Sequence, residues 1–338
     1  MKSARLLLYP FSLLYALVTS VRNYFFNKGI FTSKSFKTPT IAVGNLSVGG
    51  TGKSPQIEYL IRLLQKNNLN IATVSRGYKR ESKGMIVAKS NHTALDLGDE
   101  PFQFFQKFPD VKVVVNANRV EAIDFIEKNF DDVNTVLLDD AMQHRKVNAG
   151  FYVMLTAFDD FFYDDYVLPA GNLREARCGA KRAQVIVVTK CPMDISESDK
   201  LVISNKIKRY ALNVPIFFSK ISYDSFIFSK DEVLNLNDLD DNFILLAGIA
   251  KPEPFFKNLQ KENTLCLTYP DHHNYTNTDL QTILNKANGR KIITTEKDYA
   301  RLLDKLPSKQ LYYLPIRCEF LFNESENFDE LITNYVRS

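Results

Sequence analysis

Apolar and polar positions alternate along this chain in two different rhythms. Short apolar runs rich in β-branched residues predict strands, and longer stretches with apolar residues on one face predict helices between them. The first two thirds of the chain contain predicted strands at Thr40–Val43, Ile71–Val74, Val111–Val115, Thr135–Leu138, Phe151–Leu155 and Val185–Thr189, with helices at Gln56–Lys66 and Arg119–Asn129. Strands that alternate with helices in this way are typical of a parallel sheet with crossover helices.

A shorter series of the same kind fills the last third of the chain. It contains predicted strands at Phe243–Leu246, Thr264–Thr268, Lys291–Thr294 and Leu311–Leu314, with helices at Pro254–Gln260, Asn277–Ala287 and Lys297–Leu303. Between the two series, Ile221–Asn235 alternates apolar residues with turn formers, which favours an extended connector or a hairpin over a helix. We therefore expect two α/β domains, since 338 residues allow each to bury its own core. One very large domain is the alternative.

An apolar stretch from Leu6 to Val21 precedes both series, with cations on each side of it. A membrane-spanning helix needs about 20 apolar residues, and this run is shorter and interrupted by polar ones. A cleaved signal peptide would end in small residues, whereas here the bulky, basic Arg22–Phe26 follows. We favour a helix that lies in the membrane interface, with a helix packed on the domain surface as the alternative.

Composition narrows the class of partner more than the class of fold. Hydrophobic residues make up 45% of the chain and charged residues 24%, as in a folded protein. The net charge of +4 comes without dense basic clusters, which argues against nucleic acid as a partner and suits a phosphate or an anionic membrane. The four cysteines form no Cys-x-x-Cys pair, so we expect structural thiols in a reducing cytoplasm.

The clearest chemical signal is a glycine-rich segment between the first predicted strand and the first predicted helix. In such a loop, backbone N–H groups and the helix N-terminus surround a phosphate. The loop residues expected to do this are Ser47, Val48, Gly49, Gly50, Thr51 and Gly52. Lys53 would reach the β- and γ-phosphates of ATP, and Ser54 would ligate Mg²⁺. The strict pattern has glycine where this chain has Ser47, and the alternative is a glycine-rich turn that binds nothing.

An apolar strand that ends in two aspartates supplies the acidic partner of this loop. Asp139 stands where a carboxylate meets Mg²⁺ beside a phosphate loop, and Asp140 is either a further site residue or a cap or turn residue. Gln143, His144 and Arg145 follow directly and bring polar and cationic groups to the same sheet edge.

Four further segments are candidates whose single signals are weak. Three of them, taken singly, are more often ordinary loop or surface residues: Gly98–Pro101, Arg119 and Pro169–Glu175. Asp271–His273 has no nearby third ligand with zinc spacing. A single histidine paired with a carboxylate is the better functional interpretation there, and a structural histidine is the alternative.

Taken in order, these motifs are specific. The ordered set is Val43–Pro55, Ser75–Tyr78, Gly98–Pro101, Leu138–Arg145, Pro169–Glu175, Ala247–Ala250, Asp271–His273 and Thr295–Asp298. It resembles the tetraacyldisaccharide 4'-kinase family, the lipid A pathway kinases of Gram-negative bacteria. The resemblance runs from the N-terminal helix to about residue 300, and the family's own serine variant of the phosphate loop matches Ser47.

The resemblance implies an activity and an architecture. It implies transfer of the γ-phosphoryl group of ATP to the 4'-hydroxyl of a tetraacylated, 1-phosphorylated glucosamine disaccharide, with nucleotide bound between two α/β domains. It also implies monotopic attachment to the cytoplasmic face of the inner membrane. We expect a monomer, although no feature of the sequence fixes the oligomeric state. The expected divisions are a membrane-associated helix at 1–30, a P-loop α/β/α domain at 31–220, a β-ribbon linker at 221–235 and a smaller α/β domain at 236–338. Return of the last residues to the first domain is left open.

The same resemblance assigns roles to individual residues. It places the catalytic base at Asp99, its histidine partner at His272 (with His273 left open) and the metal aspartate at Asp139. It assigns to the phosphate site Glu100, Arg119, Asp140, Gln143, His144, Arg174 and Glu175. The chain departs from the family pattern at Ala141–Met142 and at Asn172, which puts local loop geometry in question more than chemistry.

Two other function classes share part of these signals. A membrane-docked P-loop ATPase or nucleotide-driven switch needs the same loop and metal aspartate, but it does not need a base for an acceptor hydroxyl. A non-catalytic lipid-binding module is the more distant alternative. Labelled ATP separates the classes, because a kinase yields labelled lipid and an ATPase yields inorganic phosphate alone.

Overall fold

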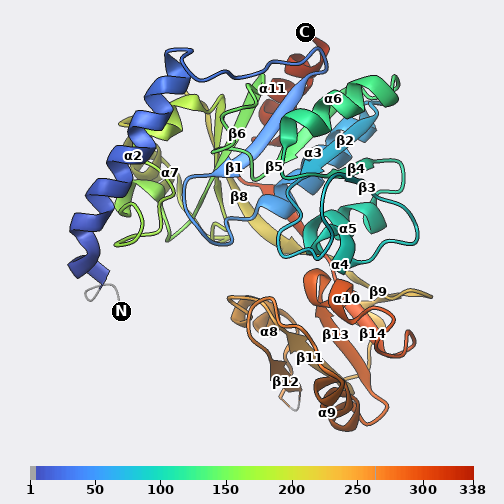
Figure 1. Ribbon diagram of the computed structural model, residues 1–338. Coiled ribbons are helices and arrows are strands. Elements are labelled where there is room, and N and C mark those ends of the chain that lie inside the picture. Colours follow the sequence, from blue (N-terminus) through green and yellow to red (C-terminus); the bar gives the residue numbers. More distant parts are fainter. Residues whose placement is uncertain (1–4, 263) are drawn as a thin grey trace.

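The computed structural model describes residues 5–262 and 264–338, and it contains two α/β domains with a helix against the side of the larger one (Figure 1). Within these residues the larger domain is built on a nine-stranded sheet and the smaller on a six-stranded sheet. The expected α/β class, with a large parallel-sheet domain, a smaller α/β domain and an N-terminal helix, is confirmed.

The larger sheet is parallel except at its two ends. Its strand order is β15 (Ile316–Phe320), β8 (Ile216–Tyr223), β7 (Val185–Thr189), β6 (Phe151–Ala157), β1 (Thr40–Asn45), β5 (Thr135–Asp139), β2 (Ile71–Ser75), β4 (Lys112–Val115) and β3 (Ile86–Val87). Every residue of the central strands β1, β5, β6 and β7 is buried, as expected for parallel strands covered on both faces. Antiparallel pairs close the two ends, β3 with β4 and β15 with β8.

Helices cover the larger sheet on both faces. The apolar sides of α3 (Lys53–Lys66) and α11 (Ser325–Arg337) pack into one core, in which Ile57 and Phe328 are buried. The helices α6 (Arg119–Asn129) and α7 (Glu197–Lys208) pack into the other, through Ile123 and Ile207. The short α4 (Ala94–Leu97) and α5 (Asp99–Lys107) lie where the larger domain faces the smaller one (Figure 1).

The N-terminal helix α2 (Tyr9–Asn27) follows a short 3-10 turn, η1 (Leu6–Leu8). The buried Ser12 accepts a hydrogen bond from the backbone N–H of Ala170 at 2.9 Å, so α2 packs on the loop that holds Pro169–Glu175. In the described part of the chain, no helix is both long and apolar enough to cross a membrane.

The smaller sheet is mostly parallel. Its strand order is β10 (Val233–Asn235), β9 (Phe226–Phe228), β14 (Leu311–Leu314), β13 (Lys291–Thr295), β11 (Phe243–Ala247) and β12 (Leu265–Thr268). One face is covered by α9 (Asn277–Ala287) and α10 (Glu296–Leu302), and the other by α8 (Glu253–Leu259). The remaining 3-10 turns are η2 (Phe162–Asp164), η3 (Arg177–Arg182) and η4 (Leu236–Asp238).

The chain passes between the domains twice. It leaves the larger domain through β8 and returns through β15, which pairs with β8 from Ile316 opposite Tyr223 to Phe320 opposite Ser219. The connector predicted at 221–235 is divided between the sheets, because β8 extends to Tyr223 and β9 and β10 join the smaller sheet as a hairpin. Ile227 is fully buried in the smaller domain's core, which explains why this segment does not remain a free linker.

Candidate active site

The carboxyl ends of the parallel strands carry the candidate site, as is usual for such sheets. The glycine-rich loop follows β1, and α3 starts directly after it at Lys53. Gly49 and Gly52 have φ angles of 112° and 82°, a region that favours glycine. The loop is pinned to the sheet edge, because the Thr189 hydroxyl donates to the backbone oxygen of Thr51 at 2.8 Å and Val48 N–H donates to Asn172 O at 2.8 Å.

Opposite charges meet at the mouth of this loop. The Nζ of Lys53 lies 3.7 Å from Oδ1 of Asp140 and 3.4 Å from Oδ1 of Asn45. Arg174 donates to both oxygens of Asp140, at 2.9 and 2.7 Å, and to Asn45 Oδ1 at 2.6 Å. Burial alone would raise the pKa of Asp140, but the hydrogen bonds from Arg174 and the charge of Lys53 outweigh it and lower that pKa.

Asp139 lies deeper, at the end of β5, and few hydrogen bonds compensate for the burial of its carboxyl group. Its Oδ2 accepts a long hydrogen bond of 3.5 Å from the Ser75 hydroxyl, and its buried Oδ1 has no partner among the described residues. Burial raises the pKa of this carboxyl, and the nearby negative charge of Glu100 raises it further. The buried Arg119 next to it donates to the Asp139 backbone oxygen at 3.4 Å and leaves its own Nε without a described partner. These unpaired groups suit a cation and an anion respectively.

Glu100 joins the phosphate loop to the smaller domain. Its Oε1 accepts hydrogen bonds from the Ser54 hydroxyl at 2.8 Å and from Lys297 Nζ, on α10, at 2.9 Å. Burial opposes the charged form of Glu100, yet the charges of Lys297 and Lys53 and the Ser54 hydrogen bond lower its pKa. Glu100 therefore remains a carboxylate that contacts both domains.

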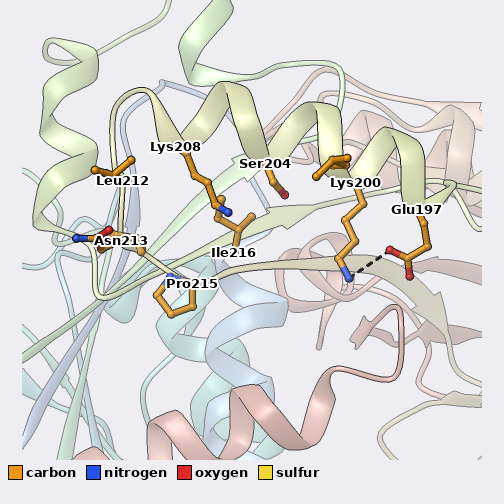
Figure 2. Close-up of a pocket in the computed structure, with 10 residues that line it drawn as sticks. Glu197, Lys200, Ser204, Lys208, Leu212, Asn213, Pro215 and Ile216 are labelled. Carbon is orange, nitrogen blue, oxygen red and sulfur yellow. Dashed lines mark ion pairs between the residues drawn. The ribbon is translucent and has the colours of Figure 1, made fainter.

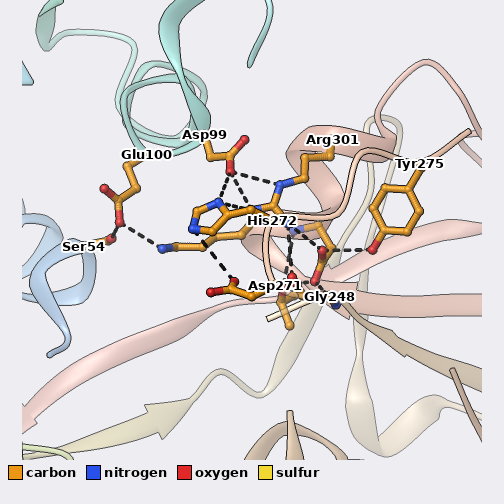
Figure 3. A network of polar contacts seen from close by, with 11 residues as sticks. Ser54, Asp99, Glu100, Gly248, Asp271, His272, Tyr275 and Arg301 are labelled. Atoms are coloured by element: carbon orange, nitrogen blue, oxygen red, sulfur yellow. Dashed lines mark hydrogen bonds and ion pairs between the residues drawn. The ribbon is translucent and has the colours of Figure 1, made fainter. Parts of the chain in front are cut away.

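Asp99, the neighbour of Glu100, meets the smaller domain at a second point (Figure 3). His272 Nδ1 lies 3.2 Å from Asp99 Oδ2, and Arg301 donates to the same oxygen through Nε at 3.0 Å and Nη2 at 2.5 Å. Burial would raise the pKa of Asp99, but these hydrogen bonds and the charge of Arg301 outweigh it and lower the pKa to about 2. His273 instead contacts Asp279, 3.0 Å from its Nε2.

Gln143, His144 and Glu175 lie on the side of the site that faces α2. Glu175 is buried and accepts hydrogen bonds from Gln143 Nε2 at 2.8 Å, from Arg182 at 2.7 Å and from Asn23 on α2 at 2.7 Å. Its contacts here are thus with the protein itself. Burial lowers the pKa of His144 to about 4, and the nearby charge of Arg119 lowers it further.

The sequence-predicted residues therefore form two neighbouring groups. One surrounds the phosphate loop and the end of β5, and the other joins α5 to the smaller domain. Ser54 and Glu100 connect them through the hydrogen bond at 2.8 Å.

The model of the tetraacyldisaccharide-1-P 4'-kinase family, LpxK, matches residues 4–337. The chain belongs to this family. A tetraacyldisaccharide 4'-kinase of Flavobacterium johnsoniae is 55% identical over 338 residues, which cover 100% of this chain and 98% of that one. One of Bacteroides thetaiotaomicron is 41% identical, with 98% and 93% covered.

A solved structure of the family is also similar. The crystal structure of "apo" form LpxK from Aquifex aeolicus in complex with ATP has a TM-score of 0.81 and 27% sequence identity, with 98% of this chain and 99% of that chain covered. The fold of this member of the tetraacyldisaccharide 4'-kinase family is thus the fold of its solved relative.

Sequence reasoning had given no role to several residues of the site. Lys297 and Arg301 lie on α10. Lys297 is within the motif Thr295–Asp298 and Arg301 follows it, and this motif had supported the family resemblance without a chemical assignment. Asn45 is buried at the end of β1 and contacts both Lys53 and Arg174. Lys190 donates to Gly50 O at 2.6 Å and follows the fully buried strand β7. The available signal was a polar residue at the end of a buried strand for Asn45 and directly after one for Lys190.

A shallow groove of about 510 Å³ lies along α7, apart from this site (Figure 2). It is lined by Lys200, Lys208, Leu212 and Pro215 among others, and Lys200 pairs with Glu197 at 3.6 Å. None of its lining residues belongs to the candidate site.

Proposed function

We propose that this protein transfers the γ-phosphoryl group of ATP to the 4'-hydroxyl of a tetraacyldisaccharide 1-phosphate, a step of lipid A biosynthesis. Family membership supports the reaction class, and one observation favours transfer to a hydroxyl over simple ATP hydrolysis. The carboxylate of Asp99 is held by His272 at 3.2 Å, one residue from the Glu100 that contacts the phosphate loop. An ATPase has no need of a base for an acceptor hydroxyl at this place.

The nucleotide is proposed to bind at the loop Ser47–Gly52 and at Lys53. The backbone N–H groups of the loop and the start of α3 attract the negative phosphates. Lys53 and Arg174 add charge, and their present partner, Asp140, is a side chain that phosphate oxygens can replace. Arg119, which has an unpaired Nε, is a further candidate for a phosphate oxygen.

Ser54 and Asp139 are the residues we propose for Mg²⁺, and the chemistry of the site fits that ion. Mg²⁺ prefers oxygen ligands and usually takes only one or two from the protein, with the rest from phosphates and water. The buried Asp139 Oδ1 that lacks a described partner is such an oxygen, and the Ser54 hydroxyl is another. When bound, Mg²⁺ would neutralise charge on the phosphates. Ser54 would then exchange its hydrogen bond to Glu100 for a metal contact.

Asp99 is proposed to accept the proton of the acceptor hydroxyl. A sugar hydroxyl is a weak nucleophile, and a carboxylate that takes its proton as the new bond forms contributes typically ~10²–10⁴-fold. His272 comes from the smaller domain, so the pair is complete only when the two domains are together. Such an arrangement limits transfer of the phosphoryl group to water.

Membrane attachment through α2 is proposed from its exposed face. Leu7 in η1 and Phe11, Leu14 and Val18 in α2 recur at helical spacing and are each more than 60% exposed. The opposite face of α2 is held to the larger domain through Ser12 and its neighbours. A lipid acceptor lies in the bilayer, so a monomer attached to the cytoplasmic face of the inner membrane would meet both its lipid and ATP.

The decisive experiment follows label from γ-labelled ATP into a tetraacyldisaccharide 1-phosphate. We expect a labelled lipid, and we expect Asp99→Ala and His272→Ala to lower turnover by about 10²-fold or more. His273→Ala is the matched comparison, because His273 contacts Asp279 instead of Asp99, and it should retain most activity. Release of inorganic phosphate without labelled lipid would support the ATPase alternative and reject the proposal.

A further inference from the structure

Two motifs without an assigned role meet beside Asp99. Gly248 lies directly after β11 and contacts Arg301 (Figure 3). Asp298 lies on α10 and contacts Arg301 as well. The carboxyl ends of β11 and β13 lie at one edge of the smaller sheet, which is why residues 50 positions apart come together. Arg301 therefore stands between the smaller domain's own framework and Asp99 of the larger domain.

One end of the Arg301 guanidinium is fixed by buried groups. Its Nη1 donates to Asp298 Oδ1 at 3.1 Å and to Gly248 O at 3.2 Å. Asp298 is fully buried and also accepts hydrogen bonds from Gly248 N at 2.8 Å, Tyr275 OH at 3.0 Å and the Thr295 hydroxyl at 2.7 Å. A buried carboxylate with this many donors holds its partner firmly.

The other end of the guanidinium grips a single oxygen of Asp99. Both Nε and Nη2 donate to Oδ2, and His272 Nδ1 approaches the same atom. In the described chain no hydrogen bond reaches Asp99 Oδ1. The contacts thus divide the carboxylate into a held oxygen and a free one.

His272 depends on the same arrangement. Its Nδ1 lies 3.0 Å from Arg301 Nη2 as well as 3.2 Å from Asp99, and one ring nitrogen cannot donate to the carboxylate and accept from the guanidinium together. With Nη2 satisfied by Asp99, Nδ1–H is left to donate to Asp99. His272 also has a φ of 58°, a strained value for this residue, and its backbone N–H donates to Gly248 O at 3.3 Å.

We propose that Arg301 is a positioning residue for phosphoryl transfer: anchored by Asp298 and Gly248, it fixes the Asp99 carboxylate so that Oδ1 is free to accept the acceptor proton. This inference rests on the proposed role of Asp99 as the base. Arg301 does not touch the reacting atoms in this role. A lysine could supply the charge but not the planar fork that contacts Asp99 and Asp298 at once.

The charges around Asp99 determine how the removal of Arg301 would change the pH profile of the enzyme. Arg301, His272 and Lys297 face it from the smaller domain, Glu100 adjoins it on α5, and Asp271 lies 3.9 Å from the far nitrogen of His272. Arg301 favours the carboxylate form, so removing it raises the pKa of Asp99. A base must be unprotonated to act. The variant should therefore lose activity at a higher pH than the wild type as the solution is acidified.

The test measures kcat and KM of Arg301→Gln for lipid phosphorylation from about pH 3 to about pH 9, a range that approaches the pKa of about 2 that Asp99 has beside Arg301. We expect kcat to fall by about 10- to 100-fold near neutral pH with KM for ATP within about twofold, and the acid limb to move to higher pH. Arg301→Lys should recover part of kcat and part of the shift. An Arg301→Gln enzyme with wild-type kcat and an unmoved acid limb would overturn the proposal.

Arg317→Gln is the matched control, because Arg317 pairs with Asp224 at 2.5 Å and has no contact with Asp99. Thermal unfolding of each variant separates lost positioning from lost structure. If Arg301→Gln does not fold, Arg301→Lys carries the test, and full kcat with an unshifted profile rejects the inference. Asp99→Ala separates the two proposals: its retained activity would reject Asp99 as the base, whereas its inactivity beside an unaffected Arg301→Gln would reject only the role of Arg301.

Discussion

At the scale of single residues, the site is organised by competition between burial and charge. Asp139 and Asp140 are neighbours in the sequence, yet their pKa values move in opposite directions. Arg174 forks onto Asp140 and keeps it charged, whereas Asp139 is buried with one unpaired oxygen. Asp140 is therefore a carboxylate that pairs with cationic side chains, whereas Asp139 is one that suits a metal ion.

Lys53 provides the first prediction at this scale. Lys53→Ala removes the cation at the mouth of the phosphate loop, so we expect kcat/KM for phosphoryl transfer to fall by about 10²-fold or more. Lys66→Ala is the control, since this exposed lysine lies in the last turn of the same helix. Steady-state kinetics with both variants checks the expectation. Equal activity of the two would contradict the role of Lys53.

At the scale of elements, α2 has one face against the larger domain and one exposed face. Its inner face is fixed by Ser12 and by Asn23, which donates to the buried Glu175 at 2.7 Å. Its outer face carries the apolar row of Phe11, Leu14 and Val18, which continues to Leu7 in the preceding turn η1. These polar contacts with the Pro169–Glu175 loop orient the helix, so its apolar row faces outward.

This orientation predicts the effect of a charge on the outer face. Leu14→Asp should weaken binding to vesicles of anionic phospholipid by about tenfold or more. A leucine side chain that enters the membrane contributes ~1.5–3 kcal/mol to binding, and a carboxylate is repelled by the anionic surface. Leu201→Asp on α7 is the matched control, as the two leucines are 61% and 62% exposed. Vesicle co-sedimentation measures the binding. A loss of the same size in both variants would show that α2 is not the attachment element.

At the scale of the whole molecule, three ion pairs between α5 and α10 tie the domains together. They join Asp99 to Arg301, Glu100 to Lys297 and Lys107 to Glu296. Lys107 also pairs with Glu58 on α3 at 2.6 Å, so one lysine serves two buried carboxylates. The contact between domains is therefore charged, and a rearrangement of the domains must break or exchange these pairs.

The pair of Lys107 and Glu296 predicts how the stability of the protein depends on pH. Burial raises the pKa of Glu296 above its ordinary value of 4.5, and the charge of Glu58 raises it further. A carboxyl with a raised pKa in the folded state stabilises the fold fully below its ordinary pKa, and this contribution is lost as pH rises through the folded-state pKa. Glu296→Gln should therefore flatten the loss of thermal stability between about pH 5 and about pH 8. An identical pH dependence in variant and wild type would contradict this.

Much of the fold followed from pattern. Val185–Thr189, Arg119–Asn129 and Asn277–Ala287 begin and end where predicted, because periodicity and turn signals coincide there. The helices α7 and α11 were not predicted, although a capping box from Ser196 to Asp199 starts α7. In α7 the apolar residues are sparse, and packing against the sheet makes the helix stable. In α11 the sequence did carry a signal, because apolar residues recur at helical spacing, at Phe328, Leu331, Ile332, Tyr335 and Val336.

The sequence by itself determined the phosphate loop, because a strand, a glycine-rich turn and a helix start are local features that need no distant partner. Through the family resemblance it also predicted that Asp99 and a histidine of the Asp271–His273 segment belong to one site. Only the tertiary structure decided that His272 rather than His273 meets Asp99, and that Arg301 holds them. These contacts join residues 173 and 202 positions apart, so they depend on how two sheets are placed against each other, and no local pattern encodes that placement.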